Sequence, residues 1–227
     1  MTRYAIFYAP PPEQPLSRLG ASLLGYDLVT GADVAPPDDP VFDDPMALGW
    51  TAVPRTYGFH ATMKAPMHLA GHASPHALED ALVAFCRDQR AFTIDLTQGL
   101  VGHTLALVLA TPSPEMDALA AACVRHFEAF RAPLTPEDRE RRHPERLTAG
   151  QVAMLDTWGY PHVLDQFQFH MTLSSELGRP DRERFEPVLR HLLAAVPLSV
   201  PVNGLMLCRQ EGPRARFVLQ RRAAFAS

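Results

Sequence analysis

Apolar side chains along this chain follow two patterns, one typical of strands and one typical of helices. Runs rich in aromatic and aliphatic residues, bounded by Gly or Pro, predict strands. They occupy 3–10, 55–66, 91–98, 104–111, 165–177 and 202–225, the last as a hairpin turning at Glu211–Pro213. Apolar residues at helical spacing predict helices over 74–90, 113–131 and 179–196. Two of these begin with Ser-Pro, a cap followed by a proline at the first helical position.

Two stretches follow neither pattern. Residues 31–54 are rich in Pro, Gly and Asp and predict a long surface excursion. Residues 135–150 are polar and rich in Arg and Glu. The remaining segments repeat in order, because each half has a strand carrying aromatic-His-x-Thr, then a helix, then two antiparallel strands. This repetition predicts a single domain over 1–227, with halves of approximately 1–112 and 113–227 forming two similar lobes related by a pseudo-twofold axis.

The first repeated segment, GFHATMKAP, predicts a polar row on one face of its strand. Side chains alternate across a strand, so residues two apart share a face. The polar face then carries His60, Thr62 and Lys64, and the apolar face carries Phe59, Ala61, Met63 and Ala65. Lys64 is notable because the rest of the Lys and Arg total of 21 is arginine.

The second segment, QFHMTLSSE, predicts the same arrangement. Its polar face carries His170, Thr172 and Ser174, and its apolar face carries Phe169, Met171 and Leu173. If the two lobes face each other, both polar rows converge on one cleft. The position that matches Lys64 holds Ser174, so the cleft is expected to be asymmetric.

This pair of rows suits phosphodiester chemistry. Imidazole titrates close to neutral pH, so one histidine can take a proton while the other gives one. A threonine hydroxyl two residues along can bind a phosphate oxygen, and an ammonium such as Lys64 can stabilise negative charge in the transition state. The scheme needs no metal and no cofactor. One His-x-Thr alone means little, but two on matching strands predict a function.

Net charge, cysteine spacing and the length of apolar runs restrict the kinds of partner and compartment that we expect. The formal net charge of −4 provides no broad basic field for tracking a nucleic-acid backbone. The cysteines Cys86, Cys123 and Cys208 are too widely spaced for a metal-type pair and predict buried thiols in a reducing cytoplasm. No stretch approaches the roughly 20 apolar residues that span a membrane. We therefore expect a cytoplasmic protein with a small-molecule substrate, no membrane contact and no obligate protein partner.

The two motif strands resemble the 2H phosphoesterase superfamily, which includes RNA 2′-5′ ligase/cyclic phosphodiesterase proteins. Within it, RYAIFYAPP, YGFHATMKAP, RAPLTPEDRERRHPERLTAGQ, WGYP and FQFHMTL resemble a bacterial branch associated with phosphonate metabolism. The resemblance spans nearly the whole chain. It implies a bilobal α+β fold with antiparallel sheets and a central cleft, acid–base roles for His60 and His170, and phosphate binding by Thr62 and Thr172.

Several aromatic residues are further candidates. Tyr4 and Tyr8 share a face of the first strand and could line the cleft, although packing in the core is at least as reasonable. Tyr160, in WGYP, could reach the cleft mouth. Tyr57 precedes His60 by three residues and would face away from it on a regular strand.

Charged and metal-binding candidates are weaker. Arg55 and the group Arg139, Arg141, Arg142 and Arg146 could contact a terminal phosphate, although charged loop residues are usually only solvated. His68, His72 and His76 recur at four-residue steps, but Gly71 and Pro75 interrupt them, which disfavours a metal site. The sequence contains neither a G-x-S-x-G nucleophile elbow nor a Walker-type phosphate loop.

The expected activity is that of a metal-independent hydrolase, a phosphodiesterase acting on a small cyclic phosphodiester. The association of the branch with phosphonate breakdown suggests a phosphoribosyl cyclic phosphate. One alternative is an enzyme processing RNA 2′,3′-cyclic phosphate ends or 2′-5′ linkages, and the acidic net charge weighs against long RNA. A second is a nucleotide- or phosphate-sensing module without catalysis. The two motifs are too alike to assign acid and base.

Overall fold

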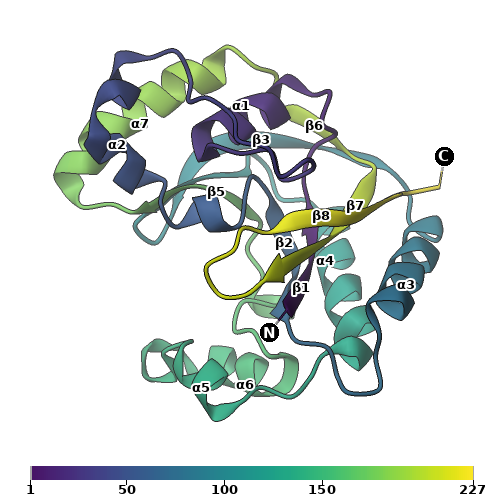
Figure 1. The fold of residues 1–227 in the computed structure, drawn as a ribbon. Coiled ribbons are helices and arrows are strands. Elements are labelled where there is room, and N and C mark those ends of the chain that lie inside the picture. The colour runs from purple at the N-terminus through teal and green to yellow at the C-terminus, as the bar shows by residue number, and fades with distance from the viewer. Residues whose placement is uncertain (1, 227) are drawn as a thin grey trace.

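The computed structural model describes residues 2–226 and shows an α+β fold built on two four-stranded antiparallel sheets (Figure 1). The first sheet has the order β2-β1-β7-β8 and the second β5-β4-β3-β6. The first comprises β1 (Thr2–Tyr8), β2 (Ala61–Met67), β7 (Gly204–Glu211) and β8 (Val218–Ala224). The second comprises β3 (Phe92–Val101), β4 (Thr104–Leu109), β5 (His170–Glu176) and β6 (Ser199–Val202).

The sheets do not coincide with the two halves of the sequence. Each half shows the predicted order of motif strand, helix and two further strands, beginning at β2 and at β5. However, each sheet takes two strands from residues 1–112 and two from residues 113–227. Neither sheet is therefore built from one half of the sequence alone, because strand pairing joins segments that are distant in sequence.

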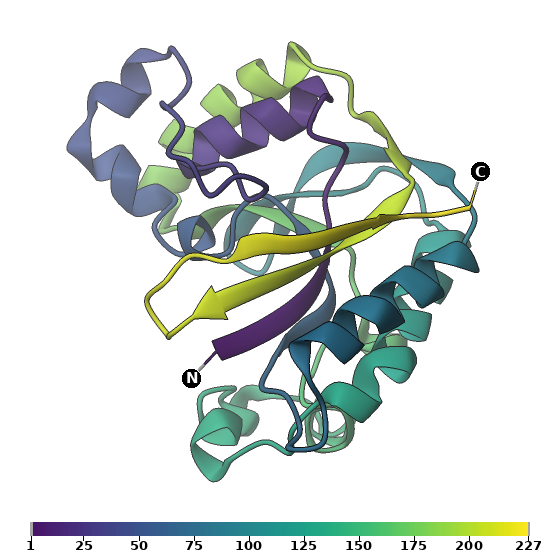
Figure 2. The ribbon, with the colours of Figure 1, turned by 45° about the vertical axis from the view of Figure 1, so that its right-hand side comes forward.

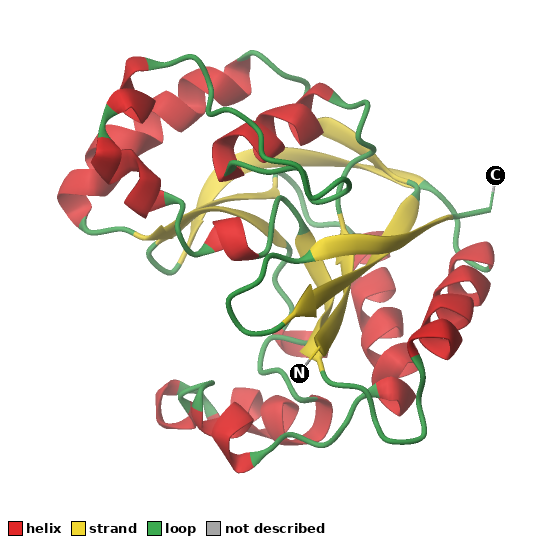
Figure 3. Ribbon diagram, viewed as in Figure 1, coloured by secondary structure: helices red, strands yellow, loops and turns green. Residues whose placement is uncertain are grey.

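Helices surround the two sheets (Figure 3). They are α1 (Pro15–Leu24), α2 (Pro45–Trp50), α3 (Pro75–Arg87), α4 (Pro114–His126), α5 (Pro136–Glu140), α6 (Ala149–Trp158) and α7 (Arg179–Ala194). Short 3-10 helices occur at Pro40–Asp43, Pro54–Thr56, Phe127–Phe130, Pro144–Arg146 and Leu164–Gln166. Helices α3 and α4 lie together beside the first sheet, and α1, α2 and α7 gather beside the second (Figures 1 and 2).

Helix starts follow the capping chemistry that the sequence predicts. The Ser74 hydroxyl accepts a hydrogen bond from the amide of Ala77 at 3.1 Å, and Ser113 does the same for Met116 at 3.2 Å. The stretch 31–54 differs from its prediction as a loop excursion, because it contains α2 and a 3-10 helix. Asp44 caps α2 and Pro45 begins it, so the same cap-and-proline signal marked this helix in the sequence.

One connected core lies between the sheets and their helices. The predicted apolar faces of both motif strands enter it, since Phe59, Ala61 and Met63 are 4%, 1% and 2% exposed. Phe169, Met171 and Leu173 join the same core. A smaller cluster covers the opposite face of the first sheet and includes Phe7, Met206 and Phe217. The three cysteines are buried free thiols, as predicted.

The close approach of α1 to the first motif generates a prediction. A Cβ added at Gly20 would lie 2.2 to 2.6 Å from ring atoms of Phe59, the residue before His60. Gly20→Ala should therefore lower the free energy of unfolding by about 1–3 kcal/mol, as overpacking does. Gly49→Ala in α2 is the matched control, because nothing lies within 4 Å of its added Cβ.

The control variant should be neutral or more stable by up to about 1 kcal/mol, because Ala favours a helix. Urea unfolding followed by circular dichroism measures both variants. Equal stabilities for Gly20→Ala and Gly49→Ala would show that α1 does not press on Phe59.

Candidate functional site

The two motif strands come together, as their paired polar rows predicted. Strands β2 and β5 contact each other although they belong to different sheets. Thr62 from the first motif and His170 from the second line one small hollow of about 20 Å³. Its other walls are Ala61, Tyr160, His162, Phe167 and Gln168. One member of each predicted row, Thr62 and His170, therefore lies at the hollow, while the catalytic roles of the histidines stay predictions.

The two motif histidines are held in the same way. His60 Nδ1 lies 2.8 Å from the carbonyl oxygen of Gly58, and His170 Nδ1 lies 2.8 Å from that of Gln168. A carbonyl oxygen can only accept, so each Nδ1 carries the hydrogen. Each neutral imidazole therefore keeps a lone pair on Nε2. His60 Nε2 lies 3.2 Å from Thr62 Oγ1, whose hydroxyl donates to it in this tautomer.

His60 sits against aromatic rings. Its ring centroid is 3.7 Å from that of Phe7 and 6.2 Å from that of Tyr57. The pKa of His60 is lowered to about 4, mainly because the imidazole is buried. The bond to the Gly58 carbonyl opposes this lowering, and the charge of His170 adds to it. The imidazole is accordingly neutral at pH 7 and able to accept a proton.

Tyr57 does not face away from His60 as a regular strand would require. Residues Pro54–Thr56 form a 3-10 helix, and Gly58 has a φ of 77°. This left-handed glycine turns the chain immediately before the motif and brings the Tyr57 ring beside His60. The sequence contained the signal, a glycine two residues before the histidine, but periodicity alone could not use it.

Lys64 does not continue the row of His60 and Thr62, so this part of the prediction is wrong. In the pairing of β2 with β1, Thr62 lies opposite Phe7 and Lys64 lies opposite Ile6. Strand β2 advances by two residues where β1 advances by one, so β2 contains a β-bulge here. The bulge reverses the alternation, so Lys64 points toward α4. Its Nζ donates to the carbonyl of Val124 at 3.0 Å and to the carboxylate of Glu128 at 2.5 Å.

This environment makes Lys64 a buried ion-pair partner. The side chain is 3% exposed, and Glu128 also pairs with Arg131. Burial lowers the pKa of Lys64, whereas the hydrogen bond and charge of Glu128 raise it. The lysine lines a neighbouring pocket rather than the hollow that holds His170. Direct contact between Lys64 and substrate stays a prediction.

The second motif strand has a matching irregularity. Thr172 pairs with Ala106 and Glu176 pairs with Thr104. Four residues of β5 therefore lie opposite two residues of β4, which is a shift of register. Ser174 is fully buried within this stretch, and its hydroxyl accepts from the amide of Leu105 at 2.9 Å. The residues two positions after each threonine, Lys64 and Ser174, are therefore buried and form hydrogen bonds inside the protein. Thr172 is half-buried, and its phosphate contact stays a prediction.

Tyr4 and Tyr8 share a face, as predicted, but that face belongs to the core and not to the cleft. They are 8% and 0% exposed. The Tyr8 hydroxyl donates to the carbonyl of Pro201 at 3.1 Å, and burial raises the pKa of Tyr8. Strand β1 lies inside its sheet with both faces covered, so alternation could not reveal which face meets the cleft.

Tyr160 and His162 complete the hollow. Tyr160 reaches it as predicted, and burial raises the pKa of its hydroxyl. Sequence reasoning missed His162, whose pKa is lowered by burial and by the charges of His170 and Arg142. Its place two residues after Tyr160, in a segment already singled out, was the available signal.

The candidate arginines differ in their partners. Arg139 pairs with Asp156 at 2.7 Å, Arg146 lies 3.6 Å from Glu145, and Arg141 pairs with Asp138. Arg142 lies over the Tyr160 ring at 5.0 Å from its centroid. Arg55 donates to the Thr51 hydroxyl at 3.1 Å. Within residues 2–226, no group of three His, Cys, Asp or Glu side chains could hold a metal ion. No helix in that range is long and apolar enough to cross a membrane.

Comparison with known proteins finds one matching family. Residues 62–218 match the family described as "Protein of unknown function (DUF1045)". A curated relative from Janthinobacterium sp. (strain Marseille), named "Ribose 1,5-bisphosphate phosphokinase PhnN", is 36% identical over 100% of this chain. A relative of the same name from Laribacter hongkongensis (strain HLHK9) is 30% identical over 96% of it. The chain spans about half the length of these relatives, 51% in each case.

Solved structures include distant matches. E. coli LigT complexed with 3′-AMP aligns over 100% of this chain and 99% of that one, with 14% identity and a TM-score of 0.46. E. coli LigT complexed with phosphate aligns over 100% and 98%, with 16% identity and a TM-score of 0.42. Similarity of this size says nothing about what the present chain binds.

The lowered pKa of His60 predicts a pH dependence of stability. An unfolded histidine titrates near 6.5 and the folded His60 near 4, so between these values the unfolded state binds the extra proton. The free energy of unfolding should therefore fall as pH drops through this window. The free energy of unfolding of His60→Gln should decrease less steeply with pH than that of the wild type, with a difference in slope of up to about 1.4 kcal/mol per pH unit.

His76→Gln is the matched control, because the His76 side chain is 84% exposed. Its unfolding free energy should follow the wild-type slope between pH 7 and pH 4 in urea titrations. If His60→Gln shows the wild-type slope as well, His60 is not held neutral by the fold.

The position of Lys64 predicts a structural cost for its removal. Lys64→Met should lower the free energy of unfolding by about 1–3 kcal/mol, because the Val124 carbonyl and Glu128 lose a buried donor. A double-mutant cycle with Glu128→Gln, followed by urea unfolding, should give a coupling energy of roughly 0.5–3 kcal/mol. Additive effects of the two substitutions would contradict the pairing.

Proposed function

The chain belongs to the DUF1045 family, and we propose that it acts as a metal-independent phosphodiesterase that hydrolyses a small cyclic phosphodiester. The observation that carries the proposal is the matched pair of histidines. Two His-x-Thr motifs from different sheets meet at one hollow, and each imidazole is tied through Nδ1 to a carbonyl oxygen. Both Nε2 atoms are thereby left for chemistry.

The proposed division of labour makes His60 the base and His170 the acid. His60 is neutral at pH 7 because burial lowers its pKa, so Nε2 can take a proton from water. The water oxygen attacks phosphorus while His170, protonated on both nitrogens, donates its Nε2 proton to the departing alkoxide oxygen. The products are a phosphate monoester and a hydroxyl, with His60 protonated and His170 neutral. Proton exchange with solvent restores the starting state.

The threonines would hold the phosphoryl group between the imidazoles. The Thr62 hydroxyl now faces His60 Nε2 and can rotate to donate to a non-bridging oxygen. Thr172 occupies the equivalent place in the second motif. Hydroxyl donors aimed at these oxygens stabilise charge as it builds on phosphorus.

The names of the curated relatives suggest a ribose phosphate context. Those relatives are called kinases, but this chain corresponds to about half of each, and its lysine follows Met63 rather than the glycine of a Walker-type loop. The kinase activity in those names is therefore not proposed for this chain. A phosphoribosyl cyclic phosphate is the proposed substrate, because the relatives' names refer to a ribose bisphosphate.

A second candidate is the processing of RNA 2′,3′-cyclic phosphate ends. Aromatic rings around the site favour it, because Tyr160 and Phe167 line the hollow and could stack on a base. The net charge of −4 disfavours long RNA. Short cyclic-ended oligonucleotides therefore belong in the same assay.

Hydrolysis assays test the proposal. Wild-type protein should hydrolyse a phosphoribosyl cyclic phosphate or a 2′,3′-cyclic nucleotide, and EDTA should leave the rate unchanged. His60→Ala and His170→Ala should each lower kcat by roughly 10²-fold or more, the size of a lost acid–base group. His76→Ala is the matched control and should retain the wild-type rate.

Three outcomes would count against the proposal. Loss of activity with EDTA would contradict a metal-free reaction. Retained turnover in both motif variants would remove the acid–base assignment. Ligand binding without turnover of any cyclic phosphate would favour a sensing module.

A further inference from the structure

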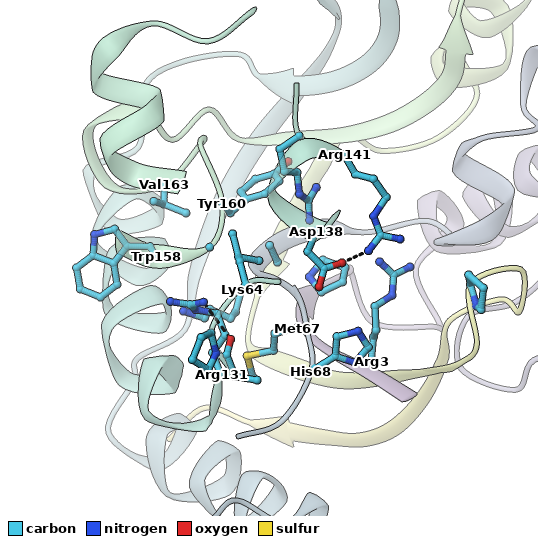
Figure 4. Close-up of a pocket in the computed structure, with 18 of the residues that line it drawn as sticks. Arg3, Lys64, Met67, His68, Arg131, Asp138, Arg141, Trp158, Tyr160 and Val163 are labelled. Carbon is cyan, nitrogen blue, oxygen red and sulfur yellow. Dashed lines mark hydrogen bonds and ion pairs between the residues drawn. The ribbon is translucent and has the colours of Figure 1, made fainter. Parts of the chain in front are cut away.

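A second and larger cavity adjoins the two-histidine hollow. It measures about 300 Å³, against about 20 Å³ for the hollow, and Tyr160 forms a wall of both. Tyr57, whose ring is 6.2 Å from that of His60, lines the cavity as well. We call this cavity the arginine pocket; Figure 4 shows it with its lining side chains.

The arginine pocket concentrates positive charge in an acidic chain. Its lining includes five side chains with formal positive charge: Arg3, Lys64, Arg131, Arg141 and Arg142. Asp138 is the only carboxylate among the described residues that line it, and Glu128 stands behind Lys64 and Arg131. Five cations therefore face two carboxylates, although the whole chain has a net charge of −4.

Two of these cations have no carboxylate partner within residues 2–226. The Arg3 guanidinium donates from Nε to the neutral amide oxygen of Gln210 at 2.9 Å, and its second nitrogen contacts the same oxygen. Arg142 lies over the Tyr160 ring. In Figure 4, Arg3 and Arg141 lie toward one side of the pocket, and Lys64 and Arg131 toward the other. Lys64 and Arg131 already share Glu128, so an anion entering between the two sides would meet its donors mainly on Arg3 and Arg142.

The charge of Arg142 is felt in the hollow. Burial raises the pKa of Tyr160 and the charge of Arg142 opposes that rise, whereas burial, His170 and Arg142 all lower the pKa of His162. Both residues line the hollow with His170. The hollow and the arginine pocket therefore share both a wall, Tyr160, and the field of one guanidinium.

We propose that the arginine pocket binds a terminal phosphate monoester of the substrate while the two histidines act on its cyclic phosphodiester. Guanidinium groups suit a phosphate dianion, which they bind with paired hydrogen bonds. A volume of about 300 Å³ accommodates a phosphate and part of a sugar. This inference rests on the proposed function and narrows the substrate to a doubly phosphorylated sugar or nucleotide.

Direct binding tests the pocket without any catalysis. Ribose 5-phosphate, which has a terminal phosphate and no cyclic diester, is titrated into the protein by calorimetry. Arg3→Gln and Arg142→Gln should each weaken its binding about tenfold or more, as loss of a charged hydrogen bond implies. Arg146→Gln is the matched control, because Arg146 comes from the same segment but lies outside the pocket lining. Inorganic phosphate is titrated in parallel, so that recognition of the sugar is separated from recognition of phosphate alone.

Thr62→Val separates the two possible places of binding. It removes a hydroxyl from the hollow and should leave ribose 5-phosphate affinity unchanged. Absence of binding to wild type, or binding that falls with Thr62→Val and not with the arginine variants, would overturn the proposal. Melting temperatures and circular dichroism verify that each variant is folded, and Arg142→Lys provides a charge-conserving version that should bind better than Arg142→Gln.

Kinetics then test the link to the reaction. A ribose 1,2-cyclic phosphate is compared with and without a 5-phosphate. Arg3→Gln should raise KM about tenfold for the phosphorylated compound and leave KM for the other compound unchanged, because Arg3 lines the pocket and not the hollow. An equal effect on both compounds would overturn the subsite. If neither compound is hydrolysed but ribose 5-phosphate binding depends on the arginines, the phosphodiesterase proposal fails and the phosphate subsite stands.

Discussion

The hydrogen bond from each motif imidazole to the carbonyl oxygen two residues before it is the constraint on which the site depends. This contact fixes the tautomer, directs Nε2 away from the backbone and occurs at 2.8 Å in both motifs. In the first motif the chain turns immediately before the histidine at Gly58, whose φ is 77°. The position of Tyr57 beside His60 follows from that turn. A short backbone contact therefore determines both the chemistry of the histidines and the aromatic surroundings of one of them.

The bulges after the two threonines divide each motif strand into a part facing the cleft and a part serving the interior. Before the bulge, His60 and Thr62 follow the alternation of a regular strand. After it, Lys64 turns to Val124 and Glu128, and Ser174 in the other motif turns to Leu105. Lys64 on β2 reaches Val124 in α4, whereas Ser174 on β5 bonds the neighbouring strand β4 at Leu105. The cation of Lys64 still contributes to the arginine pocket, where it shares Glu128 with Arg131.

Local patterns predicted much of this structure, and long-range pairing explains what they missed. Alternation correctly assigned Phe59 and Phe169 to the core, and Ser-Pro correctly marked the starts of α3 and α4. Tyr4 and Tyr8 share a face as expected, but an interior strand buries both faces, so parity alone could not place them. A bulge leaves no periodic signal, which is why Lys64 was misplaced. His162 was missed because neither repetition nor spacing singles it out.

The exchange of strands between the halves has a consequence for how the chain folds. Arg3 on β1 contacts Gln210 on β7, a separation of 207 residues, and β1 lies between β2 and β7 in its sheet. The second sheet draws only on residues 92–202, so it can form before the first is complete. Closing so long a loop is entropically costly and slows folding. The sheet that carries His60 on β2 is therefore complete only after β1 has paired with β7, a strand about 200 residues further along the chain.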